Sequence, residues 1–273
     1  MLDFILVRGN PNLKAIDIPK ALQCKTLVID GLNTFIRSWS TAPNLNENGD
    51  HIGGIVGTLK SIGYVRSNID EPITPTLQEA MQYGMDLKFV GRNNFQEFKK
   101  ELIQNNQANH IYLVDEGGYG TLGAQGAATI LSNEKTNSYN HIICAVGTGT
   151  MMAGLISAAK AHQHITGIPV LKNEATIRDE INQLIPTNKN QYTLLHDFHL
   201  GGYAKTNQAQ FDFMNLLWAT EKIPTDMVYT SKLFMAVKSL MDTNYFSPAA
   251  KILIIHSGGL QGNRSLPAGT LLF

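Results

Sequence analysis

Residues 141–160, HIICAVGTGTMMAGLISAAK, constrain the fold more than any other part of the sequence. The segment opens with an apolar run that is typical of a buried parallel strand, and this run stops at the glycine- and threonine-rich residues 147–150. Small and apolar residues then recur at helical spacing up to residue 159. The sequence therefore predicts a strand, a tight turn and a helix in direct succession.

The predicted turn is suited to binding an anion. It consists of Gly147, Thr148, Gly149 and Thr150. Glycine lets the backbone approach a ligand closely, and the free N–H groups at the start of a helix point outward, where the helix dipole favours negative charge. A phosphate-bearing ligand is the expected occupant. A tight strand-to-helix turn without a ligand is the alternative reading of the same pattern.

Strands alternate with helices along most of the chain. Strands are expected at 4–7, 26–29, 62–65, 87–90, 110–114, 142–146, 170–171 and 251–255, and helices at 75–83, 95–105, 122–133, 151–159, 177–184, 211–220 and 232–241. This alternation predicts an α/β fold with mostly parallel sheets flanked by helices. Ligands bind beyond the carboxyl ends of such strands, and three of these ends are rich in glycine, at 116–118, 147–150 and 256–259.

The composition argues against several partners. Lysine and arginine number 22, as do aspartate and glutamate, so no excess positive charge favours nucleic acid. The longest apolar runs are too short to cross a bilayer, and the start of the chain lacks the pattern of a signal peptide. Cys24 and Cys144 form no CxxC pair, which fits a reducing compartment. We therefore expect a cytoplasmic protein with no nucleic-acid or membrane partner.

Five motifs in order along the chain resemble a known family. They are VDEGGYGTLGAQG, AVGTGTMMAGL, FHLGGYAKTN, MVYTSKLFMAV and KILIIHSGGLQG. Together they resemble the aminocyclopropane-carboxylate deaminase and D-cysteine desulfhydrase family, pyridoxal-phosphate enzymes of the tryptophan synthase β fold (fold type II). The resemblance covers about residues 61–273. It implies a smaller α/β domain at 61–125 and a larger cofactor-binding domain at 126–273, after an atypical segment at 1–60.

The resemblance also implies roles for single residues. The turn at 147–150 would hold the cofactor phosphate, while Tyr229 and Thr230 would line the cofactor ring. Tyr229 would handle a proton or contact the ring, with a half-buried core tyrosine as the alternative. Ser257 would contact the ring or the substrate carboxylate, with a turn serine as the alternative. Family members that act on the cyclopropane substrate carry an acid where Thr230 stands, so Thr230 favours a D-cysteine desulfhydrase-like activity.

Such an activity would convert D-cysteine to pyruvate, ammonia and sulfide. The resemblance implies pyridoxal 5'-phosphate as the cofactor, a small amino acid as the substrate and a homodimer as the assembly. An aminocyclopropane-carboxylate deaminase-like activity is the second reading within the family.

The early part of the chain departs from the family pattern. Family members form a Schiff base through a lysine in a Ser-Gly-Asn-Lys segment, whereas Pro11 follows Gly9-Asn10 here. Proline has no primary amine for this bond, so Lys14 becomes the candidate. Lys20, Lys25 and Lys60 are the further candidates. The sequence therefore leaves open whether the chain is an enzyme or a non-catalytic chimera that binds phosphate or pyridoxal phosphate.

Residues 26–64 resemble a different family, the start of a phage-type flap or 5′-exonuclease domain. In that family the strand-end aspartate that matches Asp30 is a metal ligand. Divalent-metal nucleases need several converging carboxylates, and only Asp30 belongs to a matching motif here. We therefore predict no metal site, and nuclease activity is the least favoured function. The two resemblances meet near residues 61–64, which indicates a fusion.

Overall fold

The computed structural model describes residues 3–8, 25–30, 62–66, 86–91, 93–105, 116–172, 174–185 and 192–273, together with residues 73, 78 and 81. The chain divides into two compact units. The first combines Met1–Phe35 with Asp115–Phe273, and the second is Ile36–Val114. The division at 1–60, 61–125 and 126–273 stays a prediction, because much of the first segment lies outside the described residues.

The second unit contains a small parallel sheet and one helix. Strand β3 (Ile62–Arg66) pairs in parallel with β4 (Asp86–Val90), and helix α4 (Phe95–Asn105) follows. These elements agree with the strands and the helix that the sequence predicted there. Residues 78 and 81 are helical and fall within the helix expected at 75–83, whereas the strand expected at 110–114 lies outside the described residues.

The first unit is built on a six-stranded sheet in the order β1-β2-β8-β5-β6-β7. All five pairings are parallel. The strands are β1 (Asp3–Arg8), β2 (Lys25–Asp30), β5 (His141–Val146), β6 (His164–Pro169), β7 (Tyr192–Leu194) and β8 (Ile252–Ile255). The predicted mostly parallel α/β architecture is confirmed.

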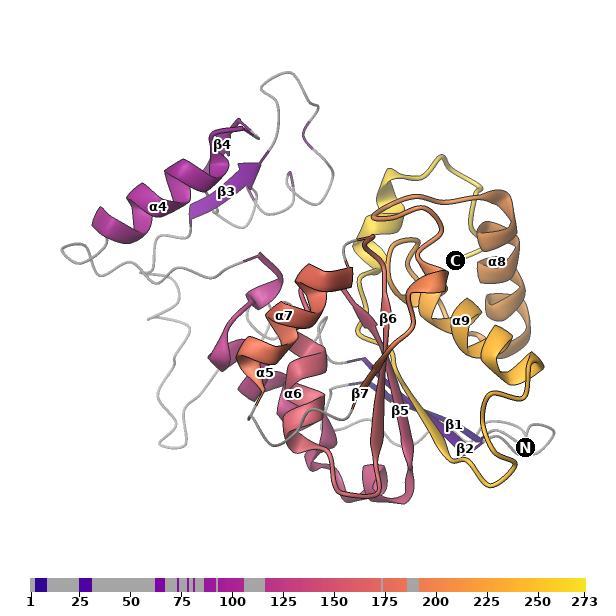
Figure 1. Ribbon diagram of the computed structural model, residues 1–273. Coiled ribbons are helices and arrows are strands. Elements are labelled where there is room, and N and C mark those ends of the chain that lie inside the picture. The colour runs from indigo at the N-terminus through magenta and orange to yellow at the C-terminus, as the bar shows by residue number, and fades with distance from the viewer. Residues whose placement is uncertain are drawn as a thin grey trace, which may run out of the picture. The chain divides into compact units, whose positions relative to one another are not determined.

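Helices cover both faces of this sheet (Figure 1). On one face lie α5 (Thr121–Ala128), α6 (Thr150–Ala158) and α7 (Glu174–Leu184). On the other lie α8 (Gln208–Glu221) and α9 (Thr230–Asp242). Within the described part of the chain, none of the helices has the length and apolar character needed to cross a membrane.

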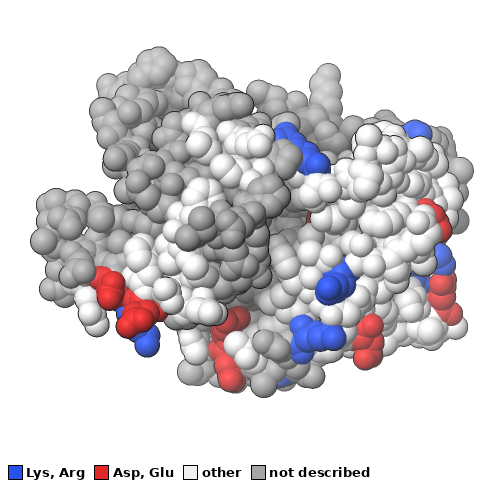
Figure 2. Space-filling view, turned by 90° about the horizontal axis from the view of Figure 1, so that it is seen from above, with Lys and Arg blue, Asp and Glu red and all other residues white. Residues whose placement is uncertain are grey.

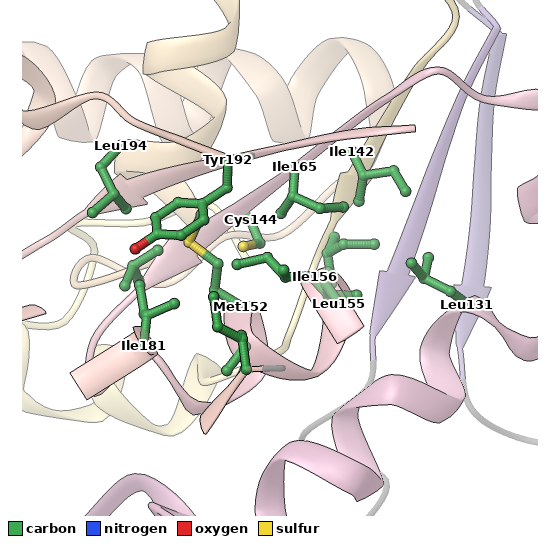
Figure 3. Close-up of a cluster of buried hydrophobic side chains, with 14 of the residues drawn as sticks. Leu131, Ile142, Cys144, Met152, Leu155, Ile156, Ile165, Ile181, Tyr192 and Leu194 are labelled. Atoms are coloured by element: carbon green, nitrogen blue, oxygen red, sulfur yellow. The ribbon is translucent and has the colours of Figure 1, made fainter. Parts of the chain in front are cut away.

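Strand β5 supplies both cores because alternate side chains of a strand point to opposite faces. Ile142 and Cys144 join the cluster under α6 and α7, which Figure 3 shows in close-up. Ile143 and Ala145 join the cluster under α9 on the opposite face. All four side chains are buried, so the apolar run read as a buried parallel strand is confirmed.

Two predicted elements differ from the observed ones, and one observed strand was not predicted. A strand was expected at 170–171, but β6 ends one residue earlier, at Pro169. Gly167 and Pro169 weaken the β-strand pattern of this segment, so its true extent was hidden. The three-residue strand β7 was missed because so short a strand has no readable alternation. The helix expected at 122–133 ends as an α-helix at Ala128 and continues as 3-10 turns, Thr129–Ser132 and Glu134–Ser138.

Helices α5 and α6 touch through their backbones at Gly154. A β-carbon added there would lie 2.3 Å from the Ala124 carbonyl oxygen and 2.8 Å from the Ala128 nitrogen. These are backbone atoms, which yield less readily than the end of a flexible side chain. The small residues of α5 and α6 therefore set the spacing of the layer that covers one face of the sheet.

We predict that Gly154→Ala destabilises the protein. Alanine favours a helix over glycine by roughly 1 kcal/mol, but overpacking against α5 costs about 1–3 kcal/mol or more. Urea denaturation should therefore show a net loss in the free energy of unfolding. The matched control is Gly126→Ala in α5, where nothing lies within 4 Å of the new β-carbon. Gly126→Ala should be neutral or stabilising, and equal effects of the two variants would contradict the close packing.

A second prediction concerns Cys144. Burial raises the pKa of its thiol from 9.0 to about 12. The unfolded chain therefore loses this proton at lower pH than the native protein does. Stability should fall between pH 9 and 12, by at most about 1.4 kcal/mol per pH unit. In urea denaturation, the free energy of unfolding of Cys144→Ala should fall less steeply across this range. The other titrating groups are the same in both proteins, so the difference reports the thiol. Parallel curves for the two proteins would refute the prediction.

Candidate functional site

The glycine- and threonine-rich turn joins β5 to α6 as the sequence predicted. Gly149 caps the start of α6 with a left-handed backbone, φ 83° and ψ −11°. A β-carbon on Gly149 would lie 2.6 Å from Cγ1 of Ile181, so α7 packs directly behind the turn. The start of α6 thus carries helix N–H groups next to a closely packed, glycine-containing turn, which is the geometry of an anion site.

Two hydroxyl groups add to this turn. Oγ1 of Thr148 and Oγ1 of Thr150 lie 3.0 Å apart. A β-carbon on Gly117 would lie 2.7 Å from Oγ1 of Thr148, so the turn Glu116–Gly118 packs against that side chain. The glycine-rich segments at 116–118 and 147–150 therefore meet, and the second of them lies at the carboxyl end of β5. We call residues 147–150 the cradle.

Tyr229 lies beside the first residue of the cradle. A β-carbon on Gly147 would lie 3.1 Å from Cε1 of Tyr229 and 3.5 Å from its hydroxyl oxygen. The ring of Tyr203 meets that of Tyr229 edge to face, with centroids 6.2 Å apart and 72° between the planes. Tyr203 is 57% exposed. Tyr203 was not among the predicted site residues, although its place in the motif FHLGGYAKTN was the available signal.

A buried carboxylate, Asp226, fixes the backbone of Tyr229. Its Oδ1 accepts hydrogen bonds from the N–H groups of Val228 (2.8 Å) and Tyr229 (2.7 Å). Its Oδ2 accepts from the N–H group of Thr230 (2.8 Å) and from the Thr230 hydroxyl (2.6 Å). These bonds satisfy donors at the start of α9 that would otherwise lack partners, and the helix dipole favours the charge. The Thr230 hydroxyl thus contacts Asp226, and its side chain is fully buried.

Two amide side chains from other elements bind the segment at residues 225–231. The buried Gln210, on α8, donates from Nε2 to the Met227 carbonyl and to the Ser231 hydroxyl, both at 2.6 Å. Asn263 donates to the Thr225 carbonyl at 2.9 Å and accepts from the Met227 N–H group at 3.0 Å. Asn263 belongs to the 3-10 helix Leu260–Ser265. Residues 225–231 are therefore tied on both sides and hold Tyr229 in place.

The third glycine-rich end, after β8, joins the same network. A β-carbon on Gly259 would lie 3.5 Å from the carboxyl carbon of Asp226. His256 is buried, and its Nδ1 accepts from the Gly258 N–H group, which leaves Nε2 to donate to the Pro224 carbonyl at 2.7 Å. Both ring nitrogens are thus used in structural contacts. Ser257 is half-buried in this turn.

The structure brings some of the predicted site residues together and leaves others untested. The cradle residues and Tyr229 are brought together, while the Thr230 hydroxyl points to Asp226. Lys14 lies outside the described residues, and its role stays a prediction. Asp30 ends β2, and no group of three or more histidine, cysteine, aspartate or glutamate side chains among the described residues could hold a metal ion. Asp226, Gln210 and Asn263 were not among the predicted site residues.

Comparison with known proteins gives distant relatives of one kind. No family model matches the chain. A putative 1-aminocyclopropane-1-carboxylate deaminase from Thermotoga maritima is 28% identical over 168 residues, 56% of this chain and 53% of the relative. A D-cysteine desulfhydrase from Salmonella newport is 26% identical over 164 residues, 54% of this chain and 50% of the relative. The chain thus spans about half the length of these curated relatives.

Solved structures share the fold. An ACC deaminase homologue superposes with a TM-score of 0.62 at 20% identity, over 78% of this chain and 70% of that one. An O-acetylserine dependent cystathionine beta-synthase from Helicobacter pylori superposes with a TM-score of 0.53 at 14% identity, over 81% of this chain and 73% of that one. The predicted fold class, the tryptophan synthase β-like fold, is confirmed.

We predict that Asp226→Ala unfolds the protein more easily. The change leaves four donors at the start of α9 without their acceptor, which should cost about 2–3 kcal/mol in urea denaturation. The control is Asp242→Ala at the other end of α9, where the carboxylate pairs with Lys238 on the surface. That exposed pair should contribute less than about 1 kcal/mol. A loss of stability in Asp226→Ala no greater than in the control would show that Asp226 does not hold the segment.

Proposed function

We propose that the chain binds pyridoxal 5'-phosphate, with the phosphate in the cradle and the ring beside Tyr229. We further propose that it acts as a deaminase or lyase on a small amino acid, D-cysteine-like rather than cyclopropane-like. The observation that carries this proposal is the position of the Tyr229 ring against Gly147, which sets an aromatic phenol beside an anion site. The names of the relatives, deaminase and desulfhydrase, support the same class.

The residues of the cradle fit a phosphate group. The start of α6 offers N–H donors and a favourable dipole, and Thr148 and Thr150 add hydroxyl donors 3.0 Å apart. Pyridoxal phosphate, when bound, supplies an electron sink for charge that develops on the substrate. The anion site would position the cofactor, and substrate recognition would fall to side chains around its ring.

Tyr229 is suited to contact the ring or to hold a proton. Asp226, Gln210 and Asn263 fix the surrounding backbone, so the phenol keeps its place beside Gly147 without reorganisation. Ser257 stays a proposed contact for the ring or the substrate carboxylate. Thr230 supports D-cysteine as the substrate, because relatives that act on the cyclopropane substrate carry an acid at this position. The hydrogen bond from its hydroxyl to Asp226 also holds the start of α9.

The proposal extends to partners. A homodimer follows from the family resemblance, and a cytoplasmic location from the composition. On the face shown in Figure 2, basic and acidic side chains are interspersed over the described surface. This mixture supports a small-molecule substrate over nucleic acid, because a nucleic-acid surface concentrates positive charge.

A specific observation favours a second candidate function. Pro11 stands where the family lysine is expected, so the chain could bind pyridoxal phosphate without turning over a substrate. In this second candidate the cradle persists while the covalent step is lost. Nuclease activity has only Asp30 as a matching carboxylate and remains the least favoured function.

The visible spectrum with pyridoxal phosphate, before and after borohydride reduction and followed by peptide mapping, tests the proposal. The enzyme proposal predicts a covalent bond trapped on one lysine, with Lys14 as the expected site, and turnover of D-cysteine. Binding without a trapped bond would favour the non-catalytic candidate. Absence of binding would overturn both.

We predict that Thr148→Val weakens pyridoxal phosphate binding by roughly ten- to a hundredfold. Valine keeps the shape of threonine but removes a hydroxyl donor to a charged group, which contributes about 1.5–3 kcal/mol. Equilibrium titration of cofactor fluorescence would measure the change. Thr220→Val is the control, since its exposed hydroxyl bonds only to the Leu216 carbonyl within α8. Equal affinities for the two variants would remove Thr148 from the phosphate site.

A further inference from the structure

Lys232 is a fully buried lysine, and among the described residues it is the one charged basic side chain in the core. Its Nζ donates to the carbonyl oxygens of His199 at 2.9 Å and of Gly202 at 2.8 Å. Burial lowers the pKa of this ammonium group, and the charge of Asp226 opposes part of that shift. A lysine in such a place is costly, because an ammonium group loses its hydration there. The two carbonyl contacts offset part of this cost.

The two carbonyls belong to an unusual turn. Leu200, Gly201 and Gly202 have φ angles of 53°, 97° and 125°, all in the region that favours glycine. Within the turn, the Gly202 N–H group donates to the His199 carbonyl at 3.0 Å, and the Gly201 N–H group donates to Nδ1 of His199 at 2.9 Å. A left-handed leucine costs about 1–2 kcal/mol, so such a turn persists only where its surroundings hold it. The Lys232 ammonium binds two carbonyls of this turn from another element of the fold.

The turn leads directly into Tyr203. The ring of Tyr203 packs edge to face on Tyr229, which lies beside the cradle. Tyr229 and Lys232 are both at the start of α9. The start of this helix therefore carries both Tyr229 and the lysine that contacts the turn before Tyr203.

We infer that Lys232 is a positioning residue, whose ammonium group holds the turn at 199–202 and thereby sets Tyr203 against Tyr229 at the cradle. The inference rests on the proposed function only in taking this site as the one that binds pyridoxal phosphate. In this role Lys232 acts through Tyr203, because its ammonium group is taken up by the two carbonyls of the turn. This separates it from the lysine that the covalent chemistry would need.

The first test reads the turn without any ligand. Lys232→Met keeps an unbranched side chain, one atom shorter, and removes the donors to both carbonyls. Amide hydrogen exchange at residues 199–203 should become at least about tenfold faster, because the turn opens more often. The control is Lys238→Met on the exposed face of α9, which should leave exchange in the turn unchanged. Unchanged exchange in a folded Lys232→Met protein would overturn the inference.

The second test is a double-mutant cycle on pyridoxal phosphate affinity. Lys232→Met should weaken binding by about tenfold or less in the wild-type background, and Lys232→Arg should restore part of it. In a Tyr203→Ala background, Lys232→Met should have no further effect, because Lys232 acts through that ring. An equal loss in both backgrounds would mean a general structural role and would overturn the inference.

The two tests also separate failure of the inference from failure of the proposed function. If the wild-type protein binds no pyridoxal phosphate, the proposed function fails, while the exchange experiment still decides the role of Lys232. If Lys232→Met does not fold, Tyr203→Ala keeps the inference testable, since Tyr203 is largely exposed. In that case Tyr203→Ala must weaken pyridoxal phosphate binding, because the inference assigns that ring a role at the cradle. Unchanged pyridoxal phosphate binding would overturn the inference.

Discussion

The hydrogen bonds of the Asp226 carboxylate are the constraint on which the rest of the site depends. A buried carboxylate is unfavourable unless donors surround it, and here three backbone N–H groups and one hydroxyl do so. The same bonds begin α9 and fix the backbone of Tyr229. Gly259 packs against this carboxylate, so the turn after β8 is positioned by it as well. One side chain thus joins a helix start, a strand end and the phenol beside the cradle.

The residues at the start of α9 contact three different parts of the site. Tyr229, Thr230 and Lys232 lie within four consecutive residues, yet each contacts a different neighbour. Tyr229 meets Gly147, Thr230 meets Asp226, and Lys232 meets the carbonyls of the turn at 199–202. A helix start suits this task because its side chains project in several directions from a backbone that the sheet and α8 already support. Sites built on such rigid elements keep their geometry better than sites built on loops alone.

The features that the sequence predicted are local ones. The apolar run of β5, the glycine turn and α6 are consecutive, so periodicity and turn chemistry were enough to find them. Asp226, Gln210, Asn263 and Lys232 were missed because their partners come from distant parts of the chain or from backbone atoms. No spacing rule encodes a lysine that binds two carbonyls of another turn. β6 was misplaced for a related reason. The side chains of Met152 and Leu194 leave no room for a β-carbon at residue 167, so glycine is required there. In the sequence, a glycine inside a strand looks like a break in the strand pattern.

The pairing of β2 with β8 has a consequence for how the chain reaches its native state. Leu27 pairs with Leu253 and Val28 with Ile254, so β1 and β2 join the sheet through the last strand of the chain. Contacts between residues so far apart form slowly, because a long loop must close first. At about 5–20 residues per second, a ribosome releases the two early strands many seconds before their partner exists. Their unpaired edges would be exposed during that interval, and exposed strand edges can pair with other chains.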